Sequence, residues 1–211
     1  MFESIGRMAA DDLRRTARAA GRPFTGSGVS VLDFGCGCGR VLRHFHEEVD
    51  RGVRFQGVDV DAEAVAWCAE NLGDYGRFDT VERVPPAPFA DETFDIVYAV
   101  SVFTHLMPED QDRWLTELGR MLKPSGILMI SLLGKTALQL AGPEVVARVE
   151  EAGCYYFDDG GTGGLPSWYQ SCFHTEGYVR ETWGRRFGVL GYIPNGLCRS
   201  QDLVVLTRLS E

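Results

Sequence analysis

Residues 29–40 read VSVLDFGCGCGR, and this stretch decides the fold class. Its first six residues are mostly apolar, as in a strand that is buried on both faces of a parallel sheet. Apolar residues then recur at helical spacing in residues 41–45. In between, Gly35, Gly37 and Gly39 permit positive φ angles and carry no β-carbon that would hold a ligand away from the main chain. The stretch predicts a strand, a tight turn and a helix, with a turn that can wrap closely around a ligand.

Two carboxylates favour a ligand over a bare turn. Asp33 lies in the apolar strand end, where burial of its charge is costly unless it meets a cation or several donors. Asp59 closes a second apolar strand over residues 55–59. A carboxylate at the tip of the second strand of a βαβ unit is placed to accept the two hydroxyls of a ribose. These positions predict a nucleoside ligand, whereas the alternative is a strand-to-helix turn that binds nothing.

Four motifs resemble one family. VLDFGCGCGR at 31–40 is similar to the first motif of the class I S-adenosylmethionine-dependent methyltransferases, and VDVD at 58–61 resembles their ribose-binding acidic motif. PFADETFDIV at 88–97 and LKPSGIL at 122–128 resemble the motifs that flank the fourth and fifth strands. The dinucleotide fingerprint fits less well, because Arg40 stands where its third glycine is required. A nicotinamide-dependent oxidoreductase is therefore the weaker alternative.

The pattern of elements predicts an α/β fold. Alternating strands and helices indicate a parallel sheet, and the resemblance implies a Rossmann-like, doubly wound, seven-stranded, mostly parallel sheet with a C-terminal antiparallel hairpin. We expect strands at 29–34, 55–59, 77–81, 93–101, 127–133, 187–193 and 202–209, and helices at 8–20, 41–49, 62–72, 110–122, 143–152 and 175–186. The last two strands are expected to join through a turn region at Asn195-Gly196.

Length and composition bound the class of protein. With 211 residues we expect one domain, 1–211, comprising an N-terminal helical cap at 1–27 and an inserted substrate lid at 134–174. A net charge of −9 disfavours nucleic acid as a partner. The sequence has no long apolar run and no apparent secretion signal, which predicts a cytoplasmic protein without a membrane span. The six cysteines form no Cys-x-x-Cys pair, so neither zinc nor a disulfide framework is indicated. The oligomeric state is not predicted.

The resemblance implies S-adenosyl-L-methionine as cofactor. Asp33 would meet its ammonium group directly or through water, and Asp59 would bind the ribose. Val60 would flank the adenine and Glu82 would reach its amine, while Val100 and Ser101 would end the fourth strand beside the sulfonium. The full set implied to bind the cofactor is Asp33, Gly35, Cys36, Gly37, Gly39, Arg40, Asp59, Val60, Glu82, Val100 and Ser101. Some metal-using relatives have a glutamate at the position of Ser101, so we expect a mechanism without a metal.

Catalysis requires an acceptor aligned with the methyl carbon and, for a hydroxyl, a base. His105, which follows the fourth strand, is the first candidate for that base and His174 is the second; either histidine can instead be structural. The acceptor side is predicted in the aromatic, glycine-rich lid, at Tyr155, Tyr156, Trp168 and Tyr169. We expect O-methylation of a small molecule or a sugar. The alternative within the same fold is a non-catalytic domain that binds the cofactor and regulates or scaffolds a partner.

Overall fold

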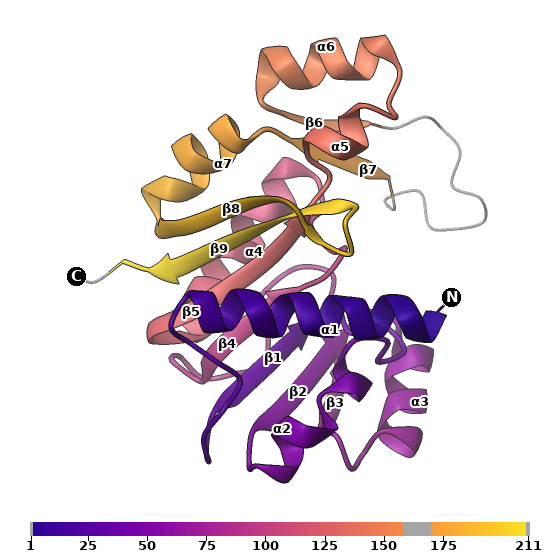
Figure 1. Ribbon diagram of the computed structural model, residues 1–211, viewed down its shortest axis with the longest axis vertical. Coiled ribbons are helices and arrows are strands. Elements are labelled where there is room, and N and C mark those ends of the chain that lie inside the picture. Colours follow the sequence, from indigo (N-terminus) through magenta and orange to yellow (C-terminus); the bar gives the residue numbers. More distant parts are fainter. Residues whose placement is uncertain (1, 158–169, 210–211) are drawn as a thin grey trace.

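Seven strands form one sheet in the order β3-β2-β1-β4-β5-β9-β8 (Figure 1). The computed structural model describes residues 2–157 and 170–209. The parallel strands are β1 (Ser30–Phe34), β2 (Arg54–Asp59), β3 (Arg77–Thr80), β4 (Phe94–Ala99) and β5 (Leu122–Leu132). The C-terminal hairpin consists of β8 (Phe187–Leu197) and β9 (Gln201–Arg208), and β9 runs antiparallel to both of its neighbours. The predicted fold class is confirmed.

Helices cover both faces of this sheet because successive strand residues point to opposite sides. On one face, α1 (Phe2–Ala19) and α3 (Ala62–Asn71) share a buried apolar cluster with Val31 and Met129. On the other, α4 (Pro108–Met121) and α7 (Glu176–Thr182) pack with Leu32 and Leu128. The arrangement has three layers, and the parallel order changes direction at β1, which lies between β2 and β4.

The segment between β5 and α7 forms a small substructure of its own. It contains α5 (Lys135–Leu138), α6 (Pro143–Ala152) and a two-stranded antiparallel sheet of β6 (Cys154–Phe157) and β7 (Ser171–His174). Figure 1 shows these elements gathered beyond one end of the main sheet. They are joined to it where the His174 N–H donates to the Leu133 carbonyl at 2.9 Å. Sequence patterning predicted α6 but neither of these two strands.

Several element boundaries differ from the prediction. The helix expected at 41–49 is a short 3₁₀ helix, η1 (Leu42–His44), followed by α2 (His46–Asp50). The fifth strand begins at Leu122 and not at 127, because Leu122 pairs with Phe94 before the register shifts. A second 3₁₀ turn, η2 (Trp183–Arg185), ends the helix that was expected to reach 186 as one piece.

The hairpin turn also lies elsewhere than predicted. Cys198 and Arg199, both with positive φ, form the turn, which the Ser200 N–H closes by donating to the Leu197 carbonyl. Asn195 does take a positive φ of 53°, but within an irregular part of β8, where its N–H donates to Asp202 Oδ1 at 2.9 Å. The carboxylate thus satisfies a backbone donor that the ladder leaves open.

None of the helices in the described ranges combines the length and the apolarity of a membrane span.

Candidate cofactor and active site

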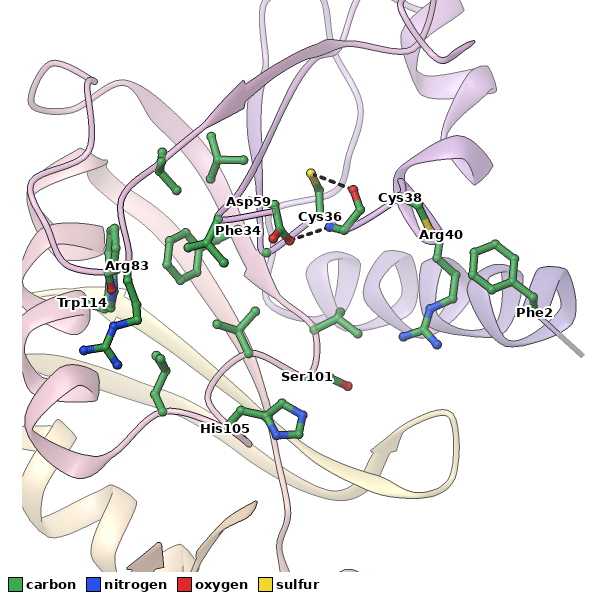
Figure 2. Close-up of a pocket in the computed structure, with 18 residues that line it drawn as sticks. Phe2, Phe34, Cys36, Cys38, Arg40, Asp59, Arg83, Ser101, His105 and Trp114 are labelled. Carbon is green, nitrogen blue, oxygen red and sulfur yellow. Dashed lines mark hydrogen bonds between the residues drawn. The ribbon is translucent and has the colours of Figure 1, made fainter. Parts of the chain in front are cut away.

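A cavity of about 350 Å³ lies at the carboxyl ends of β1, β2 and β4, within the size range of small-molecule sites. Parallel α/β sheets bind ligands at this edge, where the strand order changes direction. Apolar and aromatic side chains line most of it, with a few polar groups among them (Figure 2). The lining includes Gly35, Cys36, Gly37, Arg40, Asp59, Val60, Val100, Ser101 and His105, all of which the sequence indicated.

The three turn glycines serve different purposes, although all have positive φ angles, of 80°, 50° and 69°. A β-carbon on Gly35 would clash with Val102, and one on Gly39 would clash with Leu72 of the α3 end. A β-carbon on Gly37 would meet no described atom within 4 Å. Gly37 therefore keeps the floor of the cavity open, whereas Gly39 permits close packing and does not line the cavity.

Asp59 closes β2 and fixes the glycine turn beneath the cavity. Its Oδ2 accepts the Gly37 N–H at 2.7 Å, and its Oδ1 accepts the Asp61 N–H at 3.0 Å. Figure 2 shows the carboxylate beside the turn, on the wall of the cavity. Carboxylate oxygens have further lone pairs, so this side chain can also accept hydroxyl donors from a ligand.

Asp33 lies behind that wall and is almost wholly buried. Burial raises its pKa to about 7, while the nearby Tyr98 hydroxyl lowers it and the charge of Asp59 raises it. Its Oδ2 has no hydrogen-bond partner within the described ranges. A buried acceptor of this kind is costly, and a cation near the glycine turn would relieve that cost.

His105 projects into the cavity from the loop between β4 and α4 (Figure 2). Its Nδ1 lies 2.7 Å from the Gln170 carbonyl oxygen. A carbonyl can only accept, so Nδ1 carries the proton and Nε2 carries the lone pair of the neutral ring. Burial lowers the pKa of His105, although the bond to Gln170 raises it, which favours that neutral form near pH 7.

The backbone of Ser101 turns the chain from β4 into this loop, with a φ of 59°. Its N–H donates to Ser131 Oγ at 2.7 Å, and its hydroxyl oxygen accepts the Gln201 side-chain amide at 2.9 Å. Strands β5 and β9 thus position a loop that begins at β4. Ser101, the residue that the sequence places beside the sulfonium, is thus held by hydrogen bonds from β5 and β9.

Comparisons with known proteins agree with this geometry. A family model described as a methyltransferase domain matches residues 31–126. A ubiquinone biosynthesis O-methyltransferase of Rhodopseudomonas palustris is 31% identical over 142 residues, which are 63% of this chain and 52% of that protein. Methyltransferase GfsG of Streptomyces halstedii is 31% identical over 131 residues, 61% of this chain and 46% of that protein.

Solved structures share the fold over most of the chain. A methyltransferase of Methanosarcina mazei has a TM-score of 0.65 at 19% identity, covering 89% of this chain and 96% of that one. Magnesium protoporphyrin IX methyltransferase from Synechocystis, solved with bound S-adenosylhomocysteine (SAH), has a TM-score of 0.64 at 18% identity, covering 96% and 83%.

Over residues 31–126 the chain is similar to the methyltransferase domain family. These matches support the predicted family, enzyme class and cofactor. The chain spans about half the length of the curated relatives it matches. The family match also favours the sulfonium cofactor over the nicotinamide alternative.

The described residues around the cavity fit S-adenosylmethionine. Gly37 leaves open space above the turn, Asp33 offers a buried acceptor without a described partner, and Asp59 stands on the cavity wall. In this assignment the ammonium group would lie toward Asp33, the methionine chain along Gly37 and the ribose against Asp59. Val60, exposed at 43%, would contact the adenine.

Glu82 and His174 lie outside the cavity. Glu82 is exposed, and its neighbours Val81 and Arg83 line the wall in its place. His174 is fully buried, and its Nε2 bonds with Gln111 Oε1 at 2.9 Å. His174 therefore does not face the cofactor cavity, and its role as a base stays a prediction.

The four aromatic residues expected on the acceptor side fall into two groups. Tyr155 and Tyr156 lie half-buried in β6, and Tyr155 packs against Phe157 and the α6 cluster. Neither lines the cavity. Trp168 and Tyr169 lie outside the described residues.

Sequence reasoning missed several residues on the cavity wall, among them Phe2, Arg83 and Trp114. Trp114 belongs to the apolar stripe of α4, yet its ring also contacts Phe34 at 4.6 Å between centroids, and its Nε1–H donates to the Arg83 carbonyl at 3.0 Å. The helical spacing of Trp114 predicted burial but gave no sign of the cavity. Phe2 reaches the cavity because α1 begins six residues earlier than expected.

Proposed function

We propose that the domain transfers a methyl group from S-adenosylmethionine to a hydroxyl group of a small molecule or sugar, with His105 as the general base. The observation that carries this proposal is the ring of His105 in the cavity, with Nδ1 directed at the Gln170 carbonyl. The O-methyltransferase names of the relatives support a hydroxyl acceptor. The apolar lining supports an acceptor with an apolar body.

The chemistry assigned to this chain is positioning and proton removal. When bound, S-adenosylmethionine supplies a methyl group on a positively charged sulfur, and the electron pair of the carbon–sulfur bond stays with the sulfur. His105 Nε2 takes the acceptor's hydroxyl proton while the hydroxyl oxygen forms the bond to carbon. The bond from Nδ1–H to the Gln170 carbonyl stabilises the imidazolium that results. Such a base contributes about 10²- to 10⁴-fold to turnover.

The predicted lid, 134–174, is proposed to cover the acceptor side of the cavity through its described parts, 134–157 and 170–174. Residues 170–174 of this segment contact the loop that carries His105. The Cys172 N–H donates to the Thr104 carbonyl at 2.7 Å, and the Gln170 carbonyl accepts from His105 Nδ1. The cytoplasmic location and the exclusion of nucleic-acid acceptors remain predictions that rest on the absence of a sequence signal and on the net charge of −9.

The test measures SAH release with a panel of phenols, catechols and sugars, for the wild-type chain and for His105→Gln. We expect kcat to fall by about 10²- to 10⁴-fold, while the cofactor Kd measured by calorimetry is retained. His46→Gln is the matched control, since His46 is an exposed histidine on α2. Unchanged turnover in His105→Gln would remove the base from the proposal. Cofactor binding without turnover on any acceptor would favour the non-catalytic alternative.

A further inference from the structure

We propose that Cys154, Cys172 and His174 form a binding site for Zn²⁺. The three side chains come from the paired strands β6 and β7, and none of them lines the cofactor cavity. The proposal is independent of the methyl-transfer chemistry. It concerns residues that sequence spacing did not connect, because the two cysteines are 18 positions apart.

The distances among the three ligand atoms match the edges of a tetrahedral zinc site. Cys154 Sγ lies 3.6 Å from Cys172 Sγ, and Cys172 Sγ lies 3.8 Å from His174 Nε2. All three ligand atoms lie within 4.8 Å of one another. With Zn–S about 2.3 Å and Zn–N about 2.0–2.1 Å, a tetrahedron has an S–S edge of about 3.8 Å and an S–N edge of about 3.5 Å. The two printed edges therefore match a tetrahedral site to within a few tenths of an ångström, and the third closes with a modest rotation of the Cys154 or His174 side chain.

The strand register favours a metal over a disulfide. Cys154 pairs directly with His174, whereas Cys172 pairs with Tyr156 and so lies diagonally from Cys154 on the same face. Diagonal neighbours in an antiparallel pair are about 7–8 Å apart between Cα atoms. A disulfide needs Cα atoms closer than about 7 Å, so it would require backbone movement. A cation between the sulfurs requires none.

The surroundings orient the ligands. Gln111 contacts two of them: its Oε1 accepts from His174 Nε2 at 2.9 Å, and its Nε2 donates to Cys172 Sγ at 3.3 Å. Cys172 and His174 are fully buried, while Cys154 is half-buried and leaves one side accessible.

Binding of Zn²⁺ releases two protons, one from each cysteine. Each thiol releases one proton to solvent as its sulfur bonds to the cation. The imidazole stays neutral: Nε2 gives up its hydrogen bond to Gln111 Oε1 and its lone pair goes to the cation, while the ring proton moves to Nδ1, which has no partner within the described ranges. A water molecule completes the tetrahedron, as at zinc sites with three protein ligands.

A cation here would brace the loop that carries His105. Gln111 Nε2 also donates to the Leu106 carbonyl at 2.9 Å, and the Cys172 N–H donates to the Thr104 carbonyl. The ligands are thus joined to both sides of His105 in sequence. Zinc would fix the β6–β7 hairpin against this loop, with Gln111 as a positioning residue for Cys172.

The experiment titrates the full chain, purified with a chelator and a reductant and then freed of both, with Co²⁺ and afterwards with Zn²⁺. We expect one cobalt ion per chain, a thiolate-to-cobalt charge-transfer band in the near ultraviolet and tetrahedral d–d bands in the visible, all displaced by Zn²⁺. Removing a residue that only supports a ligand costs about 10- to 100-fold in metal affinity, so Cys154→Ser, which removes a ligand, should cost at least about 100-fold.

Cys198→Ser is the matched control, because Cys198 is also half-buried but contacts the Ile5 carbonyl, far from the cluster in sequence. It should keep the cobalt spectrum and the rise in Tm on adding Zn²⁺, and Cys154→Ser should lose both. If the buried Cys172→Ser variant fails to fold, the half-buried Cys154→Ser still decides. An absent cobalt spectrum, one that persists in Cys154→Ser, or a native mass lower by two hydrogens from a Cys154–Cys172 disulfide would overturn the proposal.

Discussion

Cofactor affinity should rise with pH in a way that depends on Asp33. In the ligand-free protein burial raises the pKa of Asp33 to about 7, and only its ionised form attracts the ammonium group. The ionised fraction is about 3% at pH 5.5 and about 50% at pH 7, and apparent affinity scales with the competent fraction. The expected Kd therefore falls by about 16-fold over this interval. The interval lies below the ordinary pKa of an α-amino group, about 7.7–8.0, so the cofactor stays protonated.

Without the cofactor, the effect of Asp33 on folding stability has the opposite pH dependence. Because the folded pKa of Asp33 is raised, its contribution to stability is complete below about pH 3.8 and is lost as pH rises through about 7. The stabilisation by bound SAH should instead grow across pH 5.5 to 7. Calorimetry and thermal unfolding, each with and without SAH, measure the two trends.

Asp33→Asn is the variant that isolates this group. It should bind SAH more weakly at pH 7 and with a Kd that no longer changes between pH 5.5 and 7. A wild-type Kd that is flat over this interval, or a slope that persists in Asp33→Asn, would refute the placement of the ammonium group beside Asp33.

Two further predictions concern the turn. Asp59→Ala should weaken S-adenosylmethionine binding by about 1.5–3 kcal/mol, since it removes a charged hydrogen-bond partner, and calorimetry that shows no loss would contradict the ribose assignment. Gly37→Ala should place a methyl group in the cavity and weaken binding by at least about tenfold, at a stability cost of about 1–2 kcal/mol for its positive φ. Gly39→Ala should cost more stability, about 2–4 kcal/mol, because its β-carbon also meets Leu72. Denaturant unfolding compares the two alanine variants, and equal stability losses would contradict these separate roles.

The cofactor side could be predicted from the sequence because its signals are local. The glycine turn lies in ten consecutive residues, and Asp59 falls at a strand end that its apolar neighbours define. Parallel-sheet topology then brings the two together without further information. Glu82 was placed in the cavity incorrectly because the short strand β3 does not fix the direction of the residues after it. Val81 and Arg83, on either side of Glu82, line the cavity instead.

The acceptor side could not be predicted because its contacts are long-range. Strands β6 and β7 pair residues that lie on either side of an excursion, and the half-buried pattern of β6 shows no alternation. The enclosure of His174 depends on Gln111, 63 positions away. The Asn195-Gly196 pair predicted a positive φ correctly, because Asn195 has one. It forms an irregular part of β8 and not the hairpin turn, because the Asn195 N–H donates to Asp202.

The partner that orients His105 is a main-chain oxygen, and this has a consequence for how the acceptor could change. A peptide carbonyl exists whatever amino acid occupies position 170, so the tautomer of the imidazole does not depend on the side chain there. With His105 as the proposed base, substitutions in residues 170–174 would therefore change which acceptor is bound without changing the proton transfer. At the contact between His105 and Gln170, the choice of acceptor and the protonation of the imidazole can thus change independently.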